Sequence, residues 1–326
     1  MLSQTKEEIL KLLFQHKETF ISGQAICEQL GCSRTAVWKH ITELRKEGYT
    51  IESVQKRGYK LLEAPKRLTK EEVLANLNSR YFGKVIDFHE VVPSTQKIAH
   101  HLAEDGATHG TLVLADEQAG GRGRLGRVWH SPKGTGIWMS LILKPDLTIN
   151  RIPQLTLLAA VAIVRSIKKV SDVDCSIKWP NDILFEGKKL VGILTELQSE
   201  MENVRAVIIG MGINVNIEWA DMPAEIRDIA TSLKIITGKT QSRVMLIQTI
   251  MTELEKLYDL YLNEGFEVIK PMWETYALSI GKVIRARTMQ GEVLQGVAKG
   301  INNDGVLLLE DDQGVVHHIY SADIEI

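Results

Sequence analysis

The chain has 326 residues, of which 39 are Lys or Arg, 41 are Asp or Glu and 44% are hydrophobic. At about 100–200 residues per domain this length predicts two or three domains, and the composition excludes disordered, collagen-like and coiled-coil proteins. No apolar run approaches the ~20 residues that span a bilayer, the N-terminus lacks a secretory signal pattern, and three cysteines without C-x-x-C spacing are typical of reduced thiols, so we expect a cytoplasmic protein.

The first 65 residues predict three helices and a hairpin. Thr5 and Glu8 form a possible capping box before the first helix, and Ser22 and Ser33 are placed to cap the second and third. Gly48 is suited to end the third helix. The runs YTIESV and GYKLLE, joined by QKRG, then read as two strands of a hairpin. This order of elements is that of a winged helix-turn-helix.

Basic residues concentrate in this segment, since residues 33–60 hold seven Lys or Arg against three Glu. A helix that presents Arg and hydroxyl groups can enter a major groove, and a basic hairpin tip can hold phosphate. The alternative is a solvated basic helix in a small three-helix domain. We predict DNA binding, through Ser22, Ser33, Arg34, Thr35, Lys39, Lys56 and Arg57.

Two further segments follow. From about residue 66 to 275 strand-like and helix-like runs alternate, and strand runs follow one another directly over residues 175–216, which favours a mixed, largely antiparallel sheet. After about residue 276 short strands are separated by breaks that each contain a glycine suited to a hairpin turn, which predicts a small barrel.

The segment 120–127 reads GGRGRLGR. It satisfies G-x-G-x-x-G literally, but a dinucleotide site requires its third glycine to open a helix, and Pro and Gly follow instead. No G-x-x-x-x-G-K-[ST] motif is present, which excludes a P-loop nucleotide triphosphatase. What the segment offers is three arginines on a backbone that can wrap an anionic ligand.

Further polar clusters stand at strand ends or turns: PSTQ at 93–96, KWPND at 178–182, GKKLVGIL at 187–194 and GMGIN at 210–214. Singly, each is typical of a helix cap, a core tryptophan or a turn. Together with GRGRLGRVW, these motifs form a series whose order and spacing are characteristic of one protein family.

This combination resembles the bifunctional biotin–protein ligases that also repress biotin operons, in their firmicute-like form, over essentially the whole chain. One departure is Gln96, where some relatives have Asn. The resemblance implies an α+β multidomain fold. It comprises an N-terminal winged helix-turn-helix (1–65), a class II synthetase-like catalytic domain with a mixed, largely antiparallel sheet and helices (66–275), and an SH3-like C-terminal β-barrel (276–326).

The resemblance also implies a reaction. Biotin and ATP form biotinyl-5'-AMP, and biotin then passes to a lysine of a biotin carboxyl carrier protein, such as a subunit of acetyl-CoA carboxylase. Lys189, Arg124 and Arg127 are the implied catalytic residues. The implied biotin site comprises Ser94, Thr95, Gln96, Gln118, Arg122, Gly123, Arg124, Lys189, Gly192, Gly210 and Gly212. The implied ATP site comprises Arg124, Arg127, Lys178, Asn181, Lys189 and Asn214, with Mg²⁺ brought by ATP and no other metal.

Neither the residues that cover adenine within 217–235 nor a general base for amine transfer can be assigned from the sequence. The resemblance implies operator DNA and an adenylate-promoted homodimer as partners, and no membrane. We expect the 120–127 loop to be mobile when empty, since its backbone has no local constraint, and to be ordered by the adenylate. Two alternatives stay open: a non-catalytic repressor that senses biotin adenylate, and a lipoate-type ligase, which leaves the GRGRLGR loop without a role.

Overall fold

The computed structural model describes residues 2–16, 19–63, 68–200, 203–288 and 291–326. The chain divides into two compact units, Met1–Asn78 and Ser79–Ile326. The predicted boundary at residue 65 lies outside the described residues, and helix α4 (Lys70–Ala75), which we assigned to the catalytic domain, belongs to the first unit, where it packs on α1. Within the described ranges no helix is long and apolar enough to cross a membrane.

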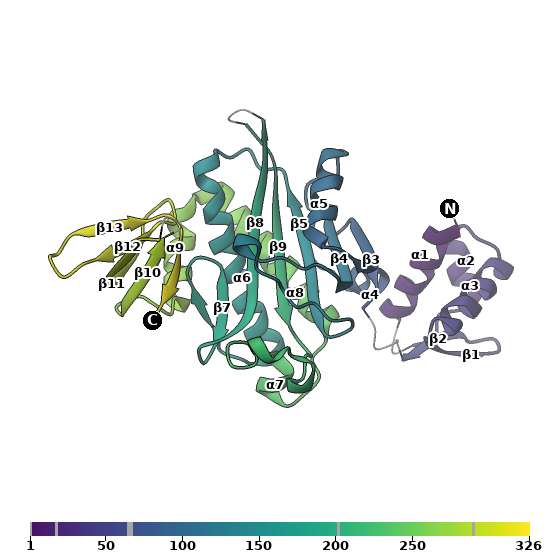
Figure 1. The fold of residues 1–326 in the computed structure, drawn as a ribbon. Coiled ribbons are helices and arrows are strands. Elements are labelled where there is room, and N and C mark those ends of the chain that lie inside the picture. Colours follow the sequence, from purple (N-terminus) through teal and green to yellow (C-terminus); the bar gives the residue numbers. More distant parts are fainter. Residues whose placement is uncertain (1, 17–18, 64–67, 201–202, 289–290) are drawn as a thin grey trace. The chain divides into compact units, whose positions relative to one another are not determined.

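The first unit is a helix-turn-helix with a two-stranded wing (Figure 1). Its elements are α1 (Leu2–Gln15), α2 (Gly23–Leu30), α3 (Arg34–Lys46), β1 (Thr50–Val54), β2 (Gly58–Glu63) and α4. The strands pair antiparallel, as the hairpin reading requires. The apolar sides of the helices form one buried core that includes Ile9, Leu13, Ile26, Ile41 and Leu44.

Most of the predicted helix starts in this unit are confirmed. The Ser22 Oγ accepts a hydrogen bond from the Ala25 N–H at 3.0 Å, and the Ser33 Oγ accepts one from the Ala36 N–H at 3.2 Å. The capping box predicted at Thr5 is wrong, because α1 begins at Leu2 and Thr5 lies inside it. No Pro or Gly interrupts the first residues, so the helix starts earlier than the box suggests.

The second unit is built on a seven-stranded sheet in the order β3-β4-β5-β9-β8-β7-β6. Its strands are β3 (Ile86–Val92), β4 (Leu112–Gln118), β5 (Gly136–Leu143), β6 (Ser176–Lys178), β7 (Asp182–Phe185), β8 (Lys188–Glu200) and β9 (Asn203–Asn214). Among the pairs, β3 and β4 run parallel and the others antiparallel, which confirms the mixed, largely antiparallel sheet. Strand β7 was not predicted, because its four residues lie between two polar motifs and show no clear period.

Helices cover both faces of this sheet (Figure 1). The helices of this unit are α5 (Thr95–Glu104), α6 (Ile152–Ser171), α7 (Leu233–Thr237), α8 (Arg243–Glu264) and α9 (Ile269–Tyr276), and the short α7 lies beside the sheet and not on a face. On β8 the Thr195 hydroxyl meets Thr156 of α6 at 2.7 Å, whereas the neighbouring Glu196 meets His100 of α5 at 3.0 Å. Since successive side chains of a strand point to opposite faces, α6 and α5 lie on opposite faces of the sheet.

The C-terminal part of this unit is a five-stranded antiparallel sheet in the order β13-β12-β11-β10-β14, consistent with an SH3-like barrel. Its strands are β10 (Val283–Thr288), β11 (Val293–Ile301), β12 (Leu307–Glu310), β13 (Val316–Ile319) and β14 (Ala322–Glu325). Gly291, Gly305 and Gly314 all have positive φ, as expected for the predicted turns. Strand β14 was missed; it carries Asp323 of the site described below, and Ser321 lies just before it.

A buried ion pair ties α8 to the sheet. Arg243 Nη1 lies 2.7 Å from Asp116 Oδ1 on β4 and also donates to the Gly136 carbonyl at 3.2 Å. Both side chains are buried. We expect Arg243→Met to lower the free energy of unfolding by about 3–5 kcal/mol, because Asp116 is left charged and unpaired. Urea denaturation checks this, with Asp116→Asn in the Arg243→Met background as control. If the second change recovers no stability, the ion pair is not the cause.

Candidate active site

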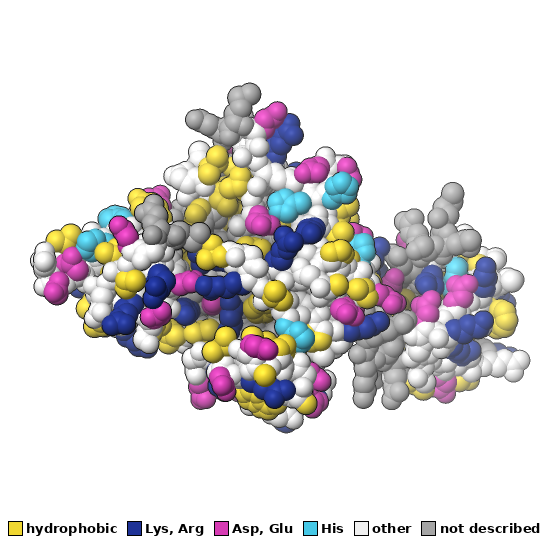
Figure 2. Space-filling model, in the orientation of Figure 1, with side chains coloured by type: hydrophobic (Ala, Val, Ile, Leu, Met, Phe, Trp, Pro, Cys, Tyr) yellow, Lys and Arg dark blue, Asp and Glu magenta, His cyan; other side chains and the backbone are white. Residues whose placement is uncertain are grey.

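A cavity of about 530 Å³ opens on the face of the sheet that α5 covers. Every residue of the implied biotin and ATP sites lines it, although these residues come from the start of α5, β4, the 120–127 loop, the strands β6, β8 and β9, and the turn between β6 and β7. Figure 2 shows Lys and Arg side chains gathered where the C-terminal sheet meets the central sheet, with carboxylates among them. The fold therefore brings the separate motifs into one site, and the role of each residue stays a prediction.

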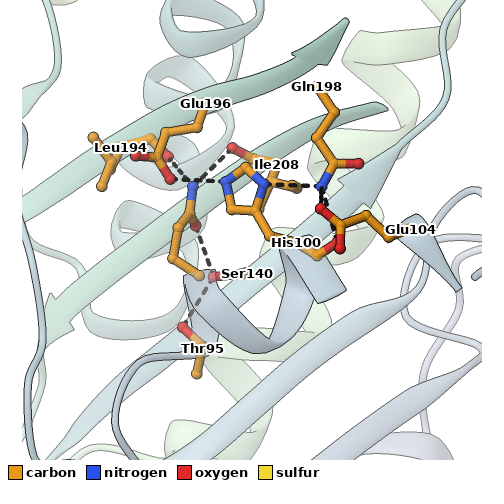
Figure 3. A network of polar contacts seen from close by, with 9 residues as sticks. Thr95, His100, Glu104, Ser140, Leu194, Glu196, Gln198 and Ile208 are labelled. Atoms are coloured by element: carbon orange, nitrogen blue, oxygen red, sulfur yellow. Dashed lines mark hydrogen bonds and ion pairs between the residues drawn. The ribbon is translucent and has the colours of Figure 1, made fainter. Parts of the chain in front are cut away.

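The floor of the cavity is a chain of hydrogen bonds (Figure 3). Gln118 Oε1 accepts from the Thr95 N–H at 2.9 Å and from its hydroxyl at 3.1 Å. The Thr95 hydroxyl lies 2.9 Å from Ser140 Oγ, which donates to Gln96 Oε1 at 2.9 Å. The Gln96 amide in turn donates to the carbonyls of Leu194 and Ile208 at 3.3 and 3.2 Å. This network fixes a polar floor without any ligand.

Ser94 differs from its neighbours. It starts α5, but its side chain makes no capping bond and has no hydrogen-bond partner among the described residues, although the residue is buried. The side-chain amide of Gln96 already bonds to two backbone carbonyls and to Ser140. Gln96 therefore shapes the floor and does not present a free polar group to a ligand. The free hydroxyl of Ser94 is therefore the better placed of the two to meet a polar ligand atom.

A second set of polar contacts continues from the floor along α5 (Figure 3). The Gln198 amide lies 3.1 Å from His100 Nδ1 and 2.9 Å from the His100 carbonyl, and 3.5 Å from Glu104. His100 Nε2 meets Glu196 at 3.0 Å. Together these contacts fasten the length of α5 to β8 and so hold the start of the helix against the cavity.

The 120–127 loop is constrained more than we expected. The Gly123 N–H donates to the Arg127 carbonyl at 2.7 Å, and the Trp129 N–H donates to the Gly121 carbonyl at 2.9 Å. Between them Arg124–Gly126 form one 3₁₀ turn, with Leu125 at φ +58° and Gly126 at φ +74°. The expectation of a backbone without local constraint is wrong, because the loop closes on itself as a narrow hairpin. The expected absence of a helix after Gly126 is confirmed.

The arginines of this loop contact the C-terminal sheet. Arg124 donates to Asn181 Oδ1 at 3.1 Å and to Ser321 Oγ at 2.9 Å, and Arg127 pairs with Asp323 on β14. Burial lowers the pKa of the Arg124 guanidinium, and Asp323 and Asp182 oppose that change. Sequence reasoning missed Ser321 and Asp323, since nothing in a short last strand indicates that it reaches the cavity.

Lys189 projects into the same cavity. Its Nζ lies 2.7 Å from Asp182 Oδ1, an ion pair that lacks hydrogen-bond geometry, and 5.4 Å from the centroid of the Trp129 ring. Arg124, also near Asp182, lies at the same end of the site. Asp182 is part of the quoted KWPND motif but was not among the predicted site residues. Its carboxylate fixes the cation that the resemblance places at the reacting centre.

Trp129 is a further residue that sequence reasoning missed, although it ends the quoted GRGRLGRVW motif. Its indole lies on Gly192 and Gly212, which are direct partners in neighbouring strands. A Cβ on Gly212 would approach the indole Nε1 to 2.4 Å, and one on Gly192 would approach the ring to 2.9 Å. The buried indole N–H has no hydrogen-bond partner among the described residues. Two glycines in register are the signal that could have shown a flat group packed on the sheet.

We expect Gly212→Ala to lower the free energy of unfolding by about 1–3 kcal/mol, because the new methyl group overpacks against the indole. In the Trp129→Ala background the same substitution should cost almost nothing. Urea denaturation of the four variants measures this coupling. An equal cost in both backgrounds would contradict the packing of Trp129 on Gly212.

The segment left open at 217–235 covers one side of the cavity. It contains the 3₁₀ turns Trp219–Asp221 and Ala224–Ile226 and then α7. The Lys189 N–H donates to the Ile229 carbonyl at 2.7 Å, and Asn214 donates to the Thr231 carbonyl at 3.0 Å. Its apolar residues at the cavity are Ile217, Met222, Ile226, Ile229 and Ala230. An apolar wall of this kind suits the face of a flat heterocycle.

The predicted DNA-binding residues lie in the first unit. Arg34, Thr35 and Lys39 are exposed on α3, and Lys56 and Arg57 stand at the tip of the wing. The hydroxyls of Ser22 and Ser33 serve as the helix caps described above, so their first role is structural.

Comparison with known proteins agrees with this arrangement. Residues 88–214 match the biotin/lipoate A/B protein ligase family, residues 5–60 match an HTH domain, and residues 279–326 match the biotin protein ligase C-terminal domain. The bifunctional ligase/repressor BirA of Bacillus subtilis is 52% identical over the full length of both chains. The chain belongs to the biotin protein ligase family.

More distant relatives match most of this chain. BirA of Escherichia coli is 28% identical over 90% of this chain and 89% of its own. The biotin protein ligase of Aquifex aeolicus, solved in complex with biotin and ATP, is 30% identical with a TM-score of 0.65 over 74% of this chain and 98% of that one. Membership in this family confirms the fold class that the motifs imply.

Proposed function

We propose that this protein is an ATP-dependent biotin–protein ligase that also acts as a biotin-responsive repressor. The observation that carries the enzymatic part is the meeting of Lys189, Arg124 and Arg127 above a polar floor in one cavity. Because ATP and operator DNA are intracellular, the proposal places the protein in the cytoplasm.

In the first step a carboxylate oxygen of biotin attacks the α-phosphorus of ATP, and pyrophosphate leaves with the electron pair of the broken P–O bond. A carboxylate of pKa near ~4–5 is already ionised at neutral pH, so this step requires no general base. The obstacle is repulsion between two anions, which at ~4 Å and an effective dielectric constant of ~20 is about 4 kcal/mol.

The cations of the cavity remove that obstacle. Lys189 is held by Asp182 at the centre, and Arg124 and Arg127 stand at the end where the loop meets the C-terminal sheet. The carboxylate of Asp182 and the amide oxygens of Asn181 and Asn214 on the cavity wall would hold Mg²⁺, which would shield the charge of the triphosphate. Rate enhancement then comes from positioning and charge neutralisation.

In the second step the neutral amine of a lysine on the carrier protein attacks the acyl carbon of biotinyl-5'-AMP, and AMP leaves. The free Ser94 hydroxyl and the floor around Thr95 and Gln118 are placed to hold the polar ureido end of biotin during both steps, because a buried urea without partners is costly. The acyl-phosphate end is then directed toward Lys189.

The two alternatives have less support. A sensor without catalysis needs no cation paired with a carboxylate at the reacting end, yet Lys189 and Asp182, both partly buried, form that pair. A lipoate-type ligase gives no role to the three arginines of the 120–127 loop, two of which engage the cavity wall.

Repression requires a second copy of the chain on the operator. Strand β7 covers β8 up to Gly192, and from Leu194 to Glu200 the described residues show no strand on the outer edge of β8. An unpaired edge is a template for another strand. We infer that a homodimer forms there and that the adenylate, by engaging the neighbouring cavity, promotes it.

We expect biotin plus ATP to tighten both dimerisation and operator binding by about 5–150-fold, the usual range for coupling between sites. Sedimentation and operator titrations with and without biotin and ATP measure the two effects. Addition of unbiotinylated carrier, which consumes the adenylate, should reverse both. A chain that dimerises and binds DNA equally well without ligand would be a ligase that carries a DNA-binding unit but no biotin-responsive switch.

A further inference from the structure

The recognition helix α3 exposes an apolar side chain that the function described so far does not use. Trp38 is 61% exposed, whereas Val37, Ile41 and Leu44 on the opposite side of α3 are buried. Among the described residues of Met1–Asn78, Leu62 on the wing is the other large apolar side chain in the exposed class, at 45%. Trp38 is thus the more exposed of the two, and it lies on the helix that carries Arg34, Thr35 and Lys39 of the predicted DNA-binding residues.

Several polar residues of α3 are already engaged within the unit. Arg34 donates to Gln24 Oε1 of α2 at 2.8 Å. Arg45 donates twice to the Ile51 carbonyl of the wing, at 3.0 and 2.6 Å. The Thr42 hydroxyl donates to the carbonyl of Trp38 within the helix itself, at 2.9 Å. Arg34 and Arg45 therefore hold α3 against α2 and the wing.

Three exposed side chains in the first half of α3 have no such bond. Among the described residues, Thr35, Trp38 and Lys39 make no side-chain hydrogen bond or ion pair to another residue. At spacings of three and four residues they share one face of the helix. A hydroxyl, an indole and an ammonium group thus form the surface that α3 presents, and its lysine suits the negative charge of a nucleic acid.

The residues that contact bases in a helix-turn-helix come from the N-terminal part of its second helix, which lies in the major groove. The groove offers one prominent apolar group, the C5-methyl of thymine, which apolar side chains contact. We propose that Trp38 is a specificity-determining residue that packs its indole against a thymine methyl group of the operator. This inference rests on the proposed repressor function and names one residue that carries its sequence preference.

The test uses the full-length chain with biotin and ATP, and a duplex selected by the wild-type protein from random-sequence DNA. Trp38→Ala should weaken binding of this duplex by about 10-fold or more, the usual cost of losing a base contact. Binding of a scrambled duplex and the dependence on salt should stay unchanged, because the phosphate contacts remain. Trp38→Phe, which keeps an apolar ring, should retain most of the preference, and Leu62→Ala is the matched control. Thermal unfolding of each variant checks the fold.

Replacement of single thymines by deoxyuridine, which lacks the methyl group, makes the test specific. At the contacted position this change should weaken wild-type binding by about 3- to 10-fold and leave Trp38→Ala unaffected. If Trp38→Ala weakens binding of the selected and the scrambled duplex equally, the proposal is wrong. It is also wrong if no single thymine-to-deoxyuridine replacement weakens wild-type binding more than it weakens binding by Trp38→Ala. Unchanged DNA binding together with altered sedimentation would assign this face to a protein contact. A wild-type chain that selects no sequence would contradict the repressor function itself.

Discussion

Lys189→Ala is expected to reduce adenylate formation by at least about 10³-fold, the upper part of the range for removing one charged or hydrogen-bonding group at a developing anion. The substitution removes the cation that Asp182 holds in the cavity at 2.7 Å. Pyrophosphate release in the presence of biotin and ATP measures the effect. Because the side chain is partly exposed, the fold should survive, which circular dichroism can verify.

Lys188→Ala is the matched control. Lys188 precedes Lys189 on β8, but its Nζ lies over the Trp219 ring at 4.8 Å, and it is not part of the cavity lining. Loss of a positive charge at this position should leave pyrophosphate release close to the wild-type rate. Wild-type rates in Lys189→Ala, or equal losses in both variants, would remove Lys189 from the reacting centre.

Deletion of residues 1–78 is expected to abolish operator binding and to preserve biotin transfer. The truncation ends where the structure divides, after α4, and leaves the cavity residues and both sheets of the second unit intact. An electrophoretic mobility shift and a biotin-transfer assay on the same preparation measure the two activities. A folded truncated protein that still binds the operator would show that the winged helix is not the DNA-binding unit.

The fold was largely predictable because its periodicities are local. The helix caps at Ser22 and Ser33 and the successive strand runs over 175–216 depend on neighbouring residues, and both predictions are confirmed. Thr5 shows the limit of this reasoning, since a capping box is a local pattern that an earlier helix start overrides. Short elements such as β7 and β14 depend on partners far away in the chain and leave little local signal.

The site, like the fold, could be predicted from the sequence only in part. The motifs gave the residues that line the cavity, but they gave no indication of which side chains are already engaged. Gln96 and Ser94 are close neighbours in the sequence, yet the structure engages the amide of one and leaves the hydroxyl of the other free. Trp129 packs on two glycines that only the strand register brings together, and Asp323 reaches the cavity through the C-terminal sheet, whose last strand gives no local signal.

The central claim is that this chain activates biotin with ATP. Isotopic exchange between labelled pyrophosphate and ATP, run separately with biotin, with lipoate and with neither, tests it most directly. We expect rapid exchange with biotin, none above background with lipoate or without an acid, and loss of the biotin-dependent exchange in Lys189→Ala. Exchange that requires lipoate, or biotin binding without any exchange, would contradict it.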